Sequence, residues 1–125
     1  MKFTHVSITV KKMDESIKFY QEILGLELIS RREIPENNAE IAFLSDKVND
    51  VRIELTYWKD KKDWTSGDEL DHLAFHLSNM GETMEKFRSQ GVEIAKEPYS
   101  LKGSTSRIAF IKDPNNIWLE IVERP

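Results

Sequence analysis

Hydrophobic and polar residues alternate along four short stretches of the chain, as they do on the two faces of a β-strand. These stretches are residues 4–10, 51–57, 71–77 and 116–122. In each one, every second residue is apolar, while the opposite face carries histidine or glutamate near its middle or start, with a second histidine, His76, in residues 71–77. The four polar residues at these positions are His5, Glu54, His72 and Glu120. A carboxylate on a strand of this kind is costly to bury unless something pairs with it.

The same pattern occurs twice along the chain. His72 follows His5 by 67 residues, and Glu120 follows Glu54 by 66 residues. Between these strands, apolar residues recur at helical spacing, first from Ile17 to Leu24 and then from Met80 to Phe87. The repeat predicts two βαβββ modules, residues 1–58 and 70–125, joined by a polar linker over residues 59–69. Together they form one α+β domain over residues 1–125.

Turn and cap residues set the expected boundaries within each module. Asp14 is the expected N-cap of the first helix, and Gly25 and Gly91 are placed to end the two helices. The expected strands are residues 2–10, 26–33, 40–44, 51–57, 70–77, 92–95, 107–111 and 117–122. Residues 98–104 are expected to form a loop. With one helix on one face of each curled mixed sheet, the other face is free to line a metal-binding cleft.

Composition narrows the class of protein. The 125 residues are 39% hydrophobic and 32% charged, with a formal net charge of −4, which argues against a nucleic-acid surface. The charges are interspersed, and no apolar run reaches membrane-spanning length, so we expect no nucleic-acid or membrane partner. The absence of cysteine excludes disulfides, thiolate ligands and a cysteine nucleophile. With no signal peptide recognisable, the cytoplasm is the expected location.

Two imidazoles and two carboxylates on the free sheet faces predict a site for one divalent metal ion. A single histidine or glutamate on a strand is usually an ordinary core, edge or surface residue. Four such residues at matching positions of a repeat are much harder to explain in that way. We therefore interpret His5, Glu54, His72 and Glu120 as candidate metal ligands.

The chain resembles glyoxalase I (lactoylglutathione lyase) of the vicinal-oxygen-chelate superfamily over essentially its whole length. The stretches that carry the resemblance are 16–20 (SIKFY), 53–57 (IELTY), 102–105 (KGST), 109–110 (AF) and 113–114 (DP). It implies that His5, Glu54, His72 and Glu120 bind the metal, with nickel or cobalt preferred in the short bacterial type and zinc possible. It also implies conversion of a methylglyoxal–thiol hemithioacetal to a 2-hydroxyacyl thioester, with Glu120 as the better candidate base and Glu54 as its counterpart.

Several positions bear on the substrate. Thr9 stands where glutathione-using members have an arginine, and the asparagine expected just after the Thr-Tyr pair is missing, so glutathione is expected to be a poor cosubstrate. Lys102 is retained at a position associated with the glycyl end of glutathione. His76 shares the His72 face, either as a substrate-pocket group or as an ordinary surface residue, and joins the metal only with difficulty. Trp118 either walls the pocket or packs in the core.

The resemblance leaves other activities of the superfamily as alternatives, and it bears on whether two chains share their sites. Epimerases of the superfamily tend to have an amide at the Glu54 position, whereas dioxygenases and thiol transferases generally use two histidines and one glutamate. A small-molecule-binding module of the same fold lacks the metal-binding residues, so their presence here argues against that alternative. The resemblance favours a homodimer with shared sites, in which His5 and Glu54 come from one chain and His72 and Glu120 from the other. The linker also allows the modules of one chain to pair.

Overall fold

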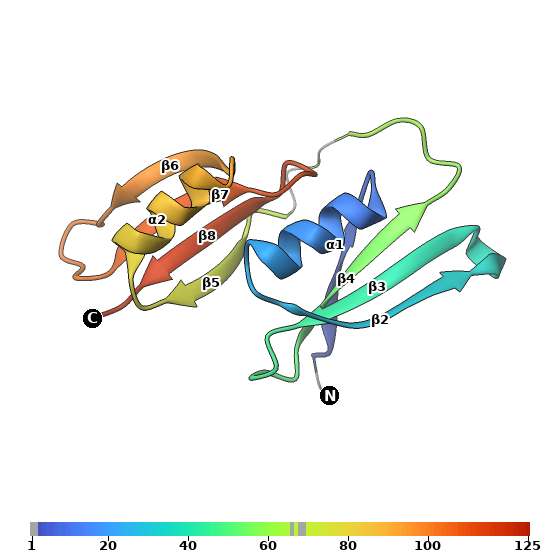
Figure 1. Ribbon diagram of the computed structural model, residues 1–125, viewed down its shortest axis with the longest axis horizontal. Helices are drawn as coiled ribbons and strands as arrows, with labels where there is room; N and C mark the ends of the chain where they lie inside the picture. Colours follow the sequence, from blue (N-terminus) through green and yellow to red (C-terminus); the bar gives the residue numbers. More distant parts are fainter. Residues whose placement is uncertain (1–2, 66, 68–69) are drawn as a thin grey trace. The chain divides into compact units, whose positions relative to one another are not determined.

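The computed structural model describes residues 3–65, 67 and 70–125 of the chain. The chain divides into two compact units, Met1–Thr65 and Ser66–Pro125, and the boundary falls within the predicted linker (Figure 1). Met1, Lys2 of the predicted first strand, and Ser66, Asp68 and Glu69 of the predicted linker lie outside the described part. None of the helices in the described ranges is long and apolar enough to cross a membrane.

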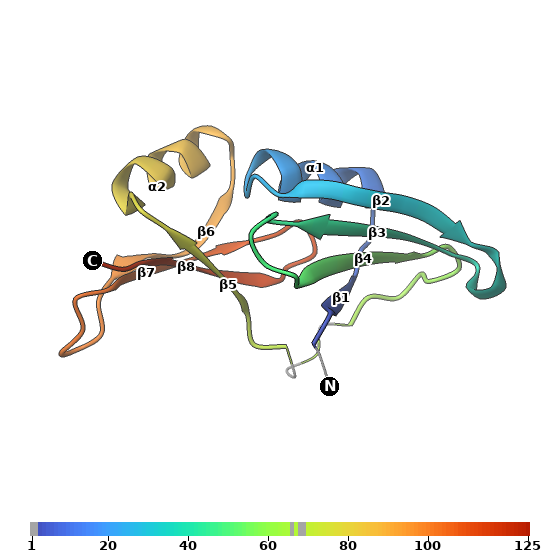
Figure 2. The ribbon, with the colours of Figure 1, turned by 90° about the horizontal axis from the view of Figure 1, so that it is seen from below.

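The first unit follows the predicted βαβββ order. Its elements are β1 (His5–Thr9), α1 (Met13–Glu22), β2 (Glu27–Ile34), a short 3-10 helix η1 (Pro35–Asn37), β3 (Ala39–Ser45) and β4 (Arg52–Trp58). The sheet has the order β1-β4-β3-β2, in which β1 and β4 are parallel and the other neighbours antiparallel. Helix α1 packs on β2, β3 and β4 and covers one face of this sheet (Figure 2).

The second unit repeats this plan. Its elements are β5 (Leu73–Leu77), α2 (Met80–Ser89), β6 (Glu93–Tyr99), β7 (Arg107–Lys112) and β8 (Trp118–Glu123). The sheet has the order β5-β8-β7-β6, with β5 and β8 parallel and α2 packed on β6 and β8 (Figure 2). The predicted α+β fold of two βαβββ modules with mixed sheets is therefore confirmed.

The apolar stripes predicted from the sequence form the core of each unit. In the first unit the fully buried residues lie between α1 and the sheet: Val10, Tyr20, Ala42, Leu44 and Leu55. In the second they lie between α2 and the sheet: Met80, Met84, Ala109, Ile111, Leu119 and Ile121. Because side chains alternate along a strand, the candidate metal ligands lie on the opposite face of their own sheet, called here the free face. They are His5 of β1, Glu54 of β4, His72 just before β5, and Glu120 of β8.

The glycines end both helices as predicted, but the start of α1 differs. Gly25 and Gly91 adopt left-handed conformations, with φ of 71° and 73°, which residues with a Cβ rarely adopt. The prediction of Asp14 as N-cap is wrong, because α1 begins at Met13 and its N-cap Lys12 makes no side-chain cap bond. The Asp14 carboxylate instead accepts a hydrogen bond from Arg31 on β2, 2.6 Å away, so a contact distant in sequence takes its side chain.

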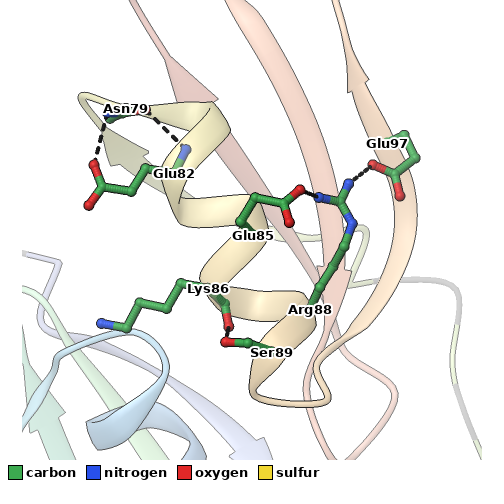
Figure 3. A network of polar contacts seen from close by, with 7 residues as sticks. All are labelled: Asn79, Glu82, Glu85, Lys86, Arg88, Ser89 and Glu97. Carbon is green, nitrogen blue, oxygen red and sulfur yellow. Dashed lines mark hydrogen bonds and ion pairs between the residues drawn. The ribbon is translucent and has the colours of Figure 1, made fainter.

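Helix α2, in contrast, has a complete cap at its start. The Asn79 Oδ1 accepts a hydrogen bond from the backbone N–H of Glu82 at 3.1 Å, and the Asn79 amide donates to the Glu82 carboxylate (Figure 3). The N–H of Met80 donates to the Glu123 carboxylate of β8 at 2.7 Å. Near the other end, Arg88 bridges α2 to Glu97 of β6 (Figure 3). These bonds fix α2 on its sheet.

One strand is longer than the sequence indicates. β6 continues through Pro98 to Tyr99, whereas residues 92–95 alone were expected as strand and residues 98–104 as loop. A proline is compatible with this position because β6 is an edge strand, where an N–H group is not required on the open side. The pairing of β6 with β7 shifts register around Lys96, and β2 shifts in the same way before Ser30. Such bulges bend a strand and add to the curl of a sheet.

Candidate metal centre

In the first unit, the parallel pair β1 and β4 brings an imidazole and a carboxylate together on the free face. The His5 Nε2 lies 3.8 Å from the Glu54 Oε2. The other ring nitrogen, Nδ1, lies 3.0 Å from the Thr4 hydroxyl. The ring of Phe43, whose backbone pairs with Glu54, meets the His5 ring edge-on at a centroid distance of 5.3 Å. The Phe43 ring therefore limits the directions in which His5 can point.

The second unit has an equivalent pair, with His72 just before β5 and Glu120 on β8. The His72 Nε2 lies 3.1 Å from the Glu120 Oε2, and its Nδ1 lies 2.7 Å from the Asp71 carboxylate. Phe110, which pairs with Glu120 across β7 and β8, meets the His72 ring edge-on at 5.7 Å. The repeat seen in the sequence thus extends to the aromatic neighbour and to the group behind each imidazole.

The chemistry of each pair fits half of a divalent metal site. Metal-binding imidazoles usually hold one ring nitrogen in a hydrogen bond, which leaves the other nitrogen to the ion. At bond lengths of about 2.1 Å, two ligands of one metal lie about 3.0 Å apart at right angles and about 3.4 Å apart in a tetrahedron. The separation is 3.1 Å in the His72–Glu120 pair and 3.8 Å in the His5–Glu54 pair, which needs a small adjustment.

Neither pair is a complete metal site by itself. Among residues 3–65, 67 and 70–125, no three histidine, aspartate or glutamate side chains are grouped as a set of metal ligands. Each unit contributes two donors of the kinds that nickel, cobalt and zinc accept.

The two carboxylates are held differently. The Glu54 Oε1 accepts hydrogen bonds from the hydroxyl groups of Ser7, at 2.8 Å, and Thr56, at 3.0 Å. Ser7 is the backbone partner of Glu54 across β1 and β4. In the second unit the backbone partner of Glu120 is Ala74, which has no hydroxyl group. In the sequence this difference shows as Ser7 and Thr56 in one half against Ala74 and Val122 in the other.

The four predicted substrate-binding residues fall into two groups. Thr9 lies at the exposed end of β1, and His76 is exposed on β5, paired with Val122. Trp118 is 37% exposed and packs its ring on Phe110 at 5.5 Å, so it belongs to the Phe110 surface and not to the core. Lys102 lies in an exposed turn before Gly103.

Sequence reasoning missed several neighbours of the site. Phe43 and Phe110 were recognisable in principle, since each follows an alanine and they stand 67 residues apart. Lys96 carried no such signal. Its ammonium group lies 5.2 Å from the Tyr99 ring and 6.0 Å from the Phe110 ring, which places a cation beside the aromatic neighbour of His72.

With two βαβββ units, each carrying an imidazole and a carboxylate on its free face, the protein is of the paired-module α+β class. Comparison with known families identifies the family within this class. Residues 2–121 match the model of the Glyoxalase/Bleomycin resistance protein/Dioxygenase superfamily, and the chain belongs to this family. Membership in the glyoxalase I branch implies a divalent metal ion.

Named relatives favour the glyoxalase I branch. The chain is 34% identical over 125 residues to the lactoylglutathione lyase of Haemophilus influenzae, covering 98% of this chain and 93% of that protein. Its structure is similar to that of Zea mays glyoxalase I, with a TM-score of 0.87 and 29% identity over 98% of this chain and 44% of that one. It also resembles the trypanothione-dependent glyoxalase I of Leishmania major, with a TM-score of 0.83 and 26% identity over 98% and 86% of the two chains.

The relatives differ in length. The chain spans 44% and 35% of two lactoylglutathione lyases from Arabidopsis thaliana, less than half of each, whereas it covers about nine tenths of the bacterial ones. Relatives from both bacteria and plants carry the name lactoylglutathione lyase.

Proposed function

We propose that this protein is a metal-dependent, glyoxalase I-like lyase. Its substrate is the hemithioacetal that a 2-oxoaldehyde such as methylglyoxal forms with a small thiol, and its product is the 2-hydroxyacyl thioester. The observation that supports this best is the repeated pairing of an imidazole Nε2 with a carboxylate Oε2, 3.8 Å apart in one unit and 3.1 Å in the other. The names of the relatives supply the reaction.

In this proposal His5, Glu54, His72 and Glu120 hold one divalent ion per site. Two imidazoles and two carboxylates leave open positions for six-coordination, which suits nickel or cobalt better than a closed tetrahedral zinc site. The bound ion would act as a Lewis acid on the negative charge that develops on the substrate oxygens. Elemental analysis of His72→Ala protein tests this, since its metal content should fall. His76→Ala, four residues further along the chain, is the matched control and should keep its metal.

The chain's own chemistry in this proposal is a proton transfer. Glu120 removes the proton from C1 of the hemithioacetal and returns it to C2, so the reaction is an isomerisation with no net gain or loss of atoms. Glu54 is the corresponding group on the other side of the site. The absence of a hydroxyl group on Ala74, the backbone partner of Glu120, favours Glu120 as the carboxylate that is free to move.

The residues expected to bind the thiol differ from those of glutathione-using members of the family. Thr9 cannot offer the two-pronged hydrogen bonding with which an arginine grips a carboxylate. Lys102 and Lys96 are the candidate cations for an anionic end of the thiol. The relationship to a trypanothione-dependent enzyme is consistent with a thiol other than glutathione. We therefore propose that glutathione is a poor or non-native cosubstrate.

The decisive experiment is a metal-dependent assay of methylglyoxal with a panel of low-molecular-weight thiols that includes glutathione. We expect thioester formation that depends on added nickel or cobalt and is removed by a chelator. Failure of every thiol, in protein shown to contain metal, would contradict the lyase assignment. Epimerase, dioxygenase, thiol-transferase and plain binding activities of the same family would then be assayed in its place.

We also propose a homodimer with two shared sites, each with His5 and Glu54 from one chain and His72 and Glu120 from the other. Glu54→Ala and Glu120→Ala subunits should each be inactive alone. When they are unfolded and refolded together, a mixed dimer collects both lesions in one site and none in the other, so activity returns. If each chain builds its own site, mixing restores nothing. Mass spectrometry confirms that mixed dimers are present.

The cytoplasmic location stays a prediction.

A further inference from the structure

The two repeated pairs differ in how their carboxylates are held, although each lies beside an imidazole at an equivalent strand position. The side chains of Glu54 and Glu120 are about equally exposed, at 17% and 20%, so access to solvent does not distinguish them. What distinguishes them is a pair of hydroxyl groups, from Ser7 and Thr56, that lies against Glu54.

We propose that Ser7 and Thr56 are positioning residues that fix Glu54 as a permanent ligand through one oxygen. Their absence beside Glu120 leaves that carboxylate free to leave the metal and act as the base. This inference rests on the proposed lyase function, but the role of the two hydroxyl groups can be measured without any substrate.

The three side chains form a compact triangle of polar contacts. Ser7 Oγ lies 2.8 Å and Thr56 Oγ1 lies 3.0 Å from the Glu54 Oε1, and the two hydroxyl oxygens lie 2.9 Å from each other. Two hydroxyl protons serve these three contacts. Whichever way the hydroxyl groups rotate, at least one proton points at the Glu54 Oε1, because an ionised carboxylate can only accept.

This triangle selects which carboxylate oxygen is left for a metal. Oε1 is engaged by the hydroxyl groups, while Oε2 is the oxygen that lies toward the His5 Nε2, at 3.8 Å. Hydrogen bonds to a charged acceptor are about twice as strong as those between neutral groups, so turning Glu54 away breaks at least one bond of the stronger kind. Thr56 is nearly buried, at 6% exposed, and β1 and β4 are adjacent strands, so the donors are themselves held in place.

The second unit has apolar side chains at both corresponding positions. Ala74 lies opposite Glu120 in the register of β5 and β8, as Ser7 lies opposite Glu54, and Val122 is two residues beyond Glu120, as Thr56 is beyond Glu54. Neither the Ala74 nor the Val122 side chain can donate a hydrogen bond. The Glu120 carboxylate instead lies beside the His72 Nε2, 3.1 Å away.

The first experiment removes the hydroxyl groups and measures metal binding in the full-length protein. In Ser7→Ala/Thr56→Val, affinity for nickel and cobalt is determined by competition with a chelator, and the absorption spectrum of the cobalt form reports the ligand set. We expect affinity to fall roughly 10- to 100-fold, as for other residues that orient metal ligands, and the cobalt spectrum to change. Ser7→Thr/Thr56→Ser keeps both hydroxyl groups and should stay within a few-fold of wild type.

Two results would overturn the role of the hydroxyl groups. One is wild-type affinity and an unchanged cobalt spectrum in Ser7→Ala/Thr56→Val. The other is an equal loss in Ser7→Thr/Thr56→Ser, which would show that shape and not hydrogen bonding matters. Thermal unfolding of the metal-free proteins verifies that each variant folds. Thr56→Val was chosen because valine preserves the shape of the threonine side chain. If the double variant does not fold, the single variants Ser7→Ala and Thr56→Val are measured in its place.

The reciprocal experiment transfers the hydroxyl pair to the second unit. Ala74→Ser/Val122→Thr should hold Glu120 as Glu54 is held, so kcat should fall at least tenfold while metal affinity is retained or improved. Unchanged kcat would overturn the claim that freedom of Glu120 matters. If wild-type protein binds metal but forms no thioester with any thiol, the proposed lyase function fails, and the affinity and cobalt spectrum still decide the role of Ser7 and Thr56.

Discussion

Replacing Glu120 by glutamine tests the proton transfer most directly. Glutamine has the same number and arrangement of heavy atoms as glutamate, so the packing of a side chain that is 20% exposed and lies 3.1 Å from the His72 Nε2 is preserved. What is lost is the negative charge and the ability to accept a proton. A positioned acid–base group contributes about 10²- to 10⁴-fold to a rate, so kcat should fall by that factor, about 3–5.5 kcal/mol in the barrier.

The assay measures kcat for thioester formation together with the metal content and thermal unfolding of Glu120→Gln. Glu54→Gln is the matched control, because its amide oxygen can still accept the hydroxyl protons of Ser7 and Thr56 that now reach Glu54 at 2.8 and 3.0 Å. We expect the smaller loss of kcat in Glu54→Gln. Near-wild-type turnover of Glu120→Gln with metal bound would refute the reasoning and move the proton transfer to Glu54 or another group.

Three further predictions concern specificity and stability. Thr9→Arg should lower KM for the glutathione adduct, because arginine supplies the missing carboxylate fork; a wild-type KM already as low as in typical family members would contradict this. Asn79→Ala removes the side-chain cap of α2 and should lower the free energy of unfolding by about 1 kcal/mol in urea titrations. Lys12→Asn supplies a cap that α1 lacks and should raise the free energy of unfolding by about 0.5–1 kcal/mol. The pKa of Asp46 is lowered from 3.8 by hydrogen bonds from the backbone N–H and side-chain amide of Asn49 and from a neighbouring N–H. The carboxylate of Asp46 therefore stabilises the folded protein above pH 3.8, and this stabilisation is lost as the pH falls through the lowered pKa of the folded state. Asp46→Asn should therefore destabilise at pH 7, with the difference from wild type vanishing in acid; a difference that persists in acid would contradict this.

Local patterns in the sequence determined which residues share a face and where the helices end. Alternation alone assigns Ile8 and Val10 to the core and His5 to the free face, because adjacent side chains on any strand point to opposite sides. The left-handed conformation at Gly25 and Gly91 is likewise a local requirement that only a few residue types meet. The 67-residue repeat then identified the two histidine–glutamate pairs without any structure.

Contacts distant in sequence were decided only by the tertiary structure. The sequence marked Asp14 as a helix cap, but Arg31 on a neighbouring strand takes its carboxylate. In the same way, nothing local to Ser7 indicates that a hydroxyl group 47 residues away from Glu54 along the chain will lie 2.8 Å from it. Periodicity reports the face of each element on its own, whereas the register of one strand against another depends on how the whole sheet packs. The sequence by itself therefore determined the pairs of candidate ligands, and the tertiary structure decided what holds each of them.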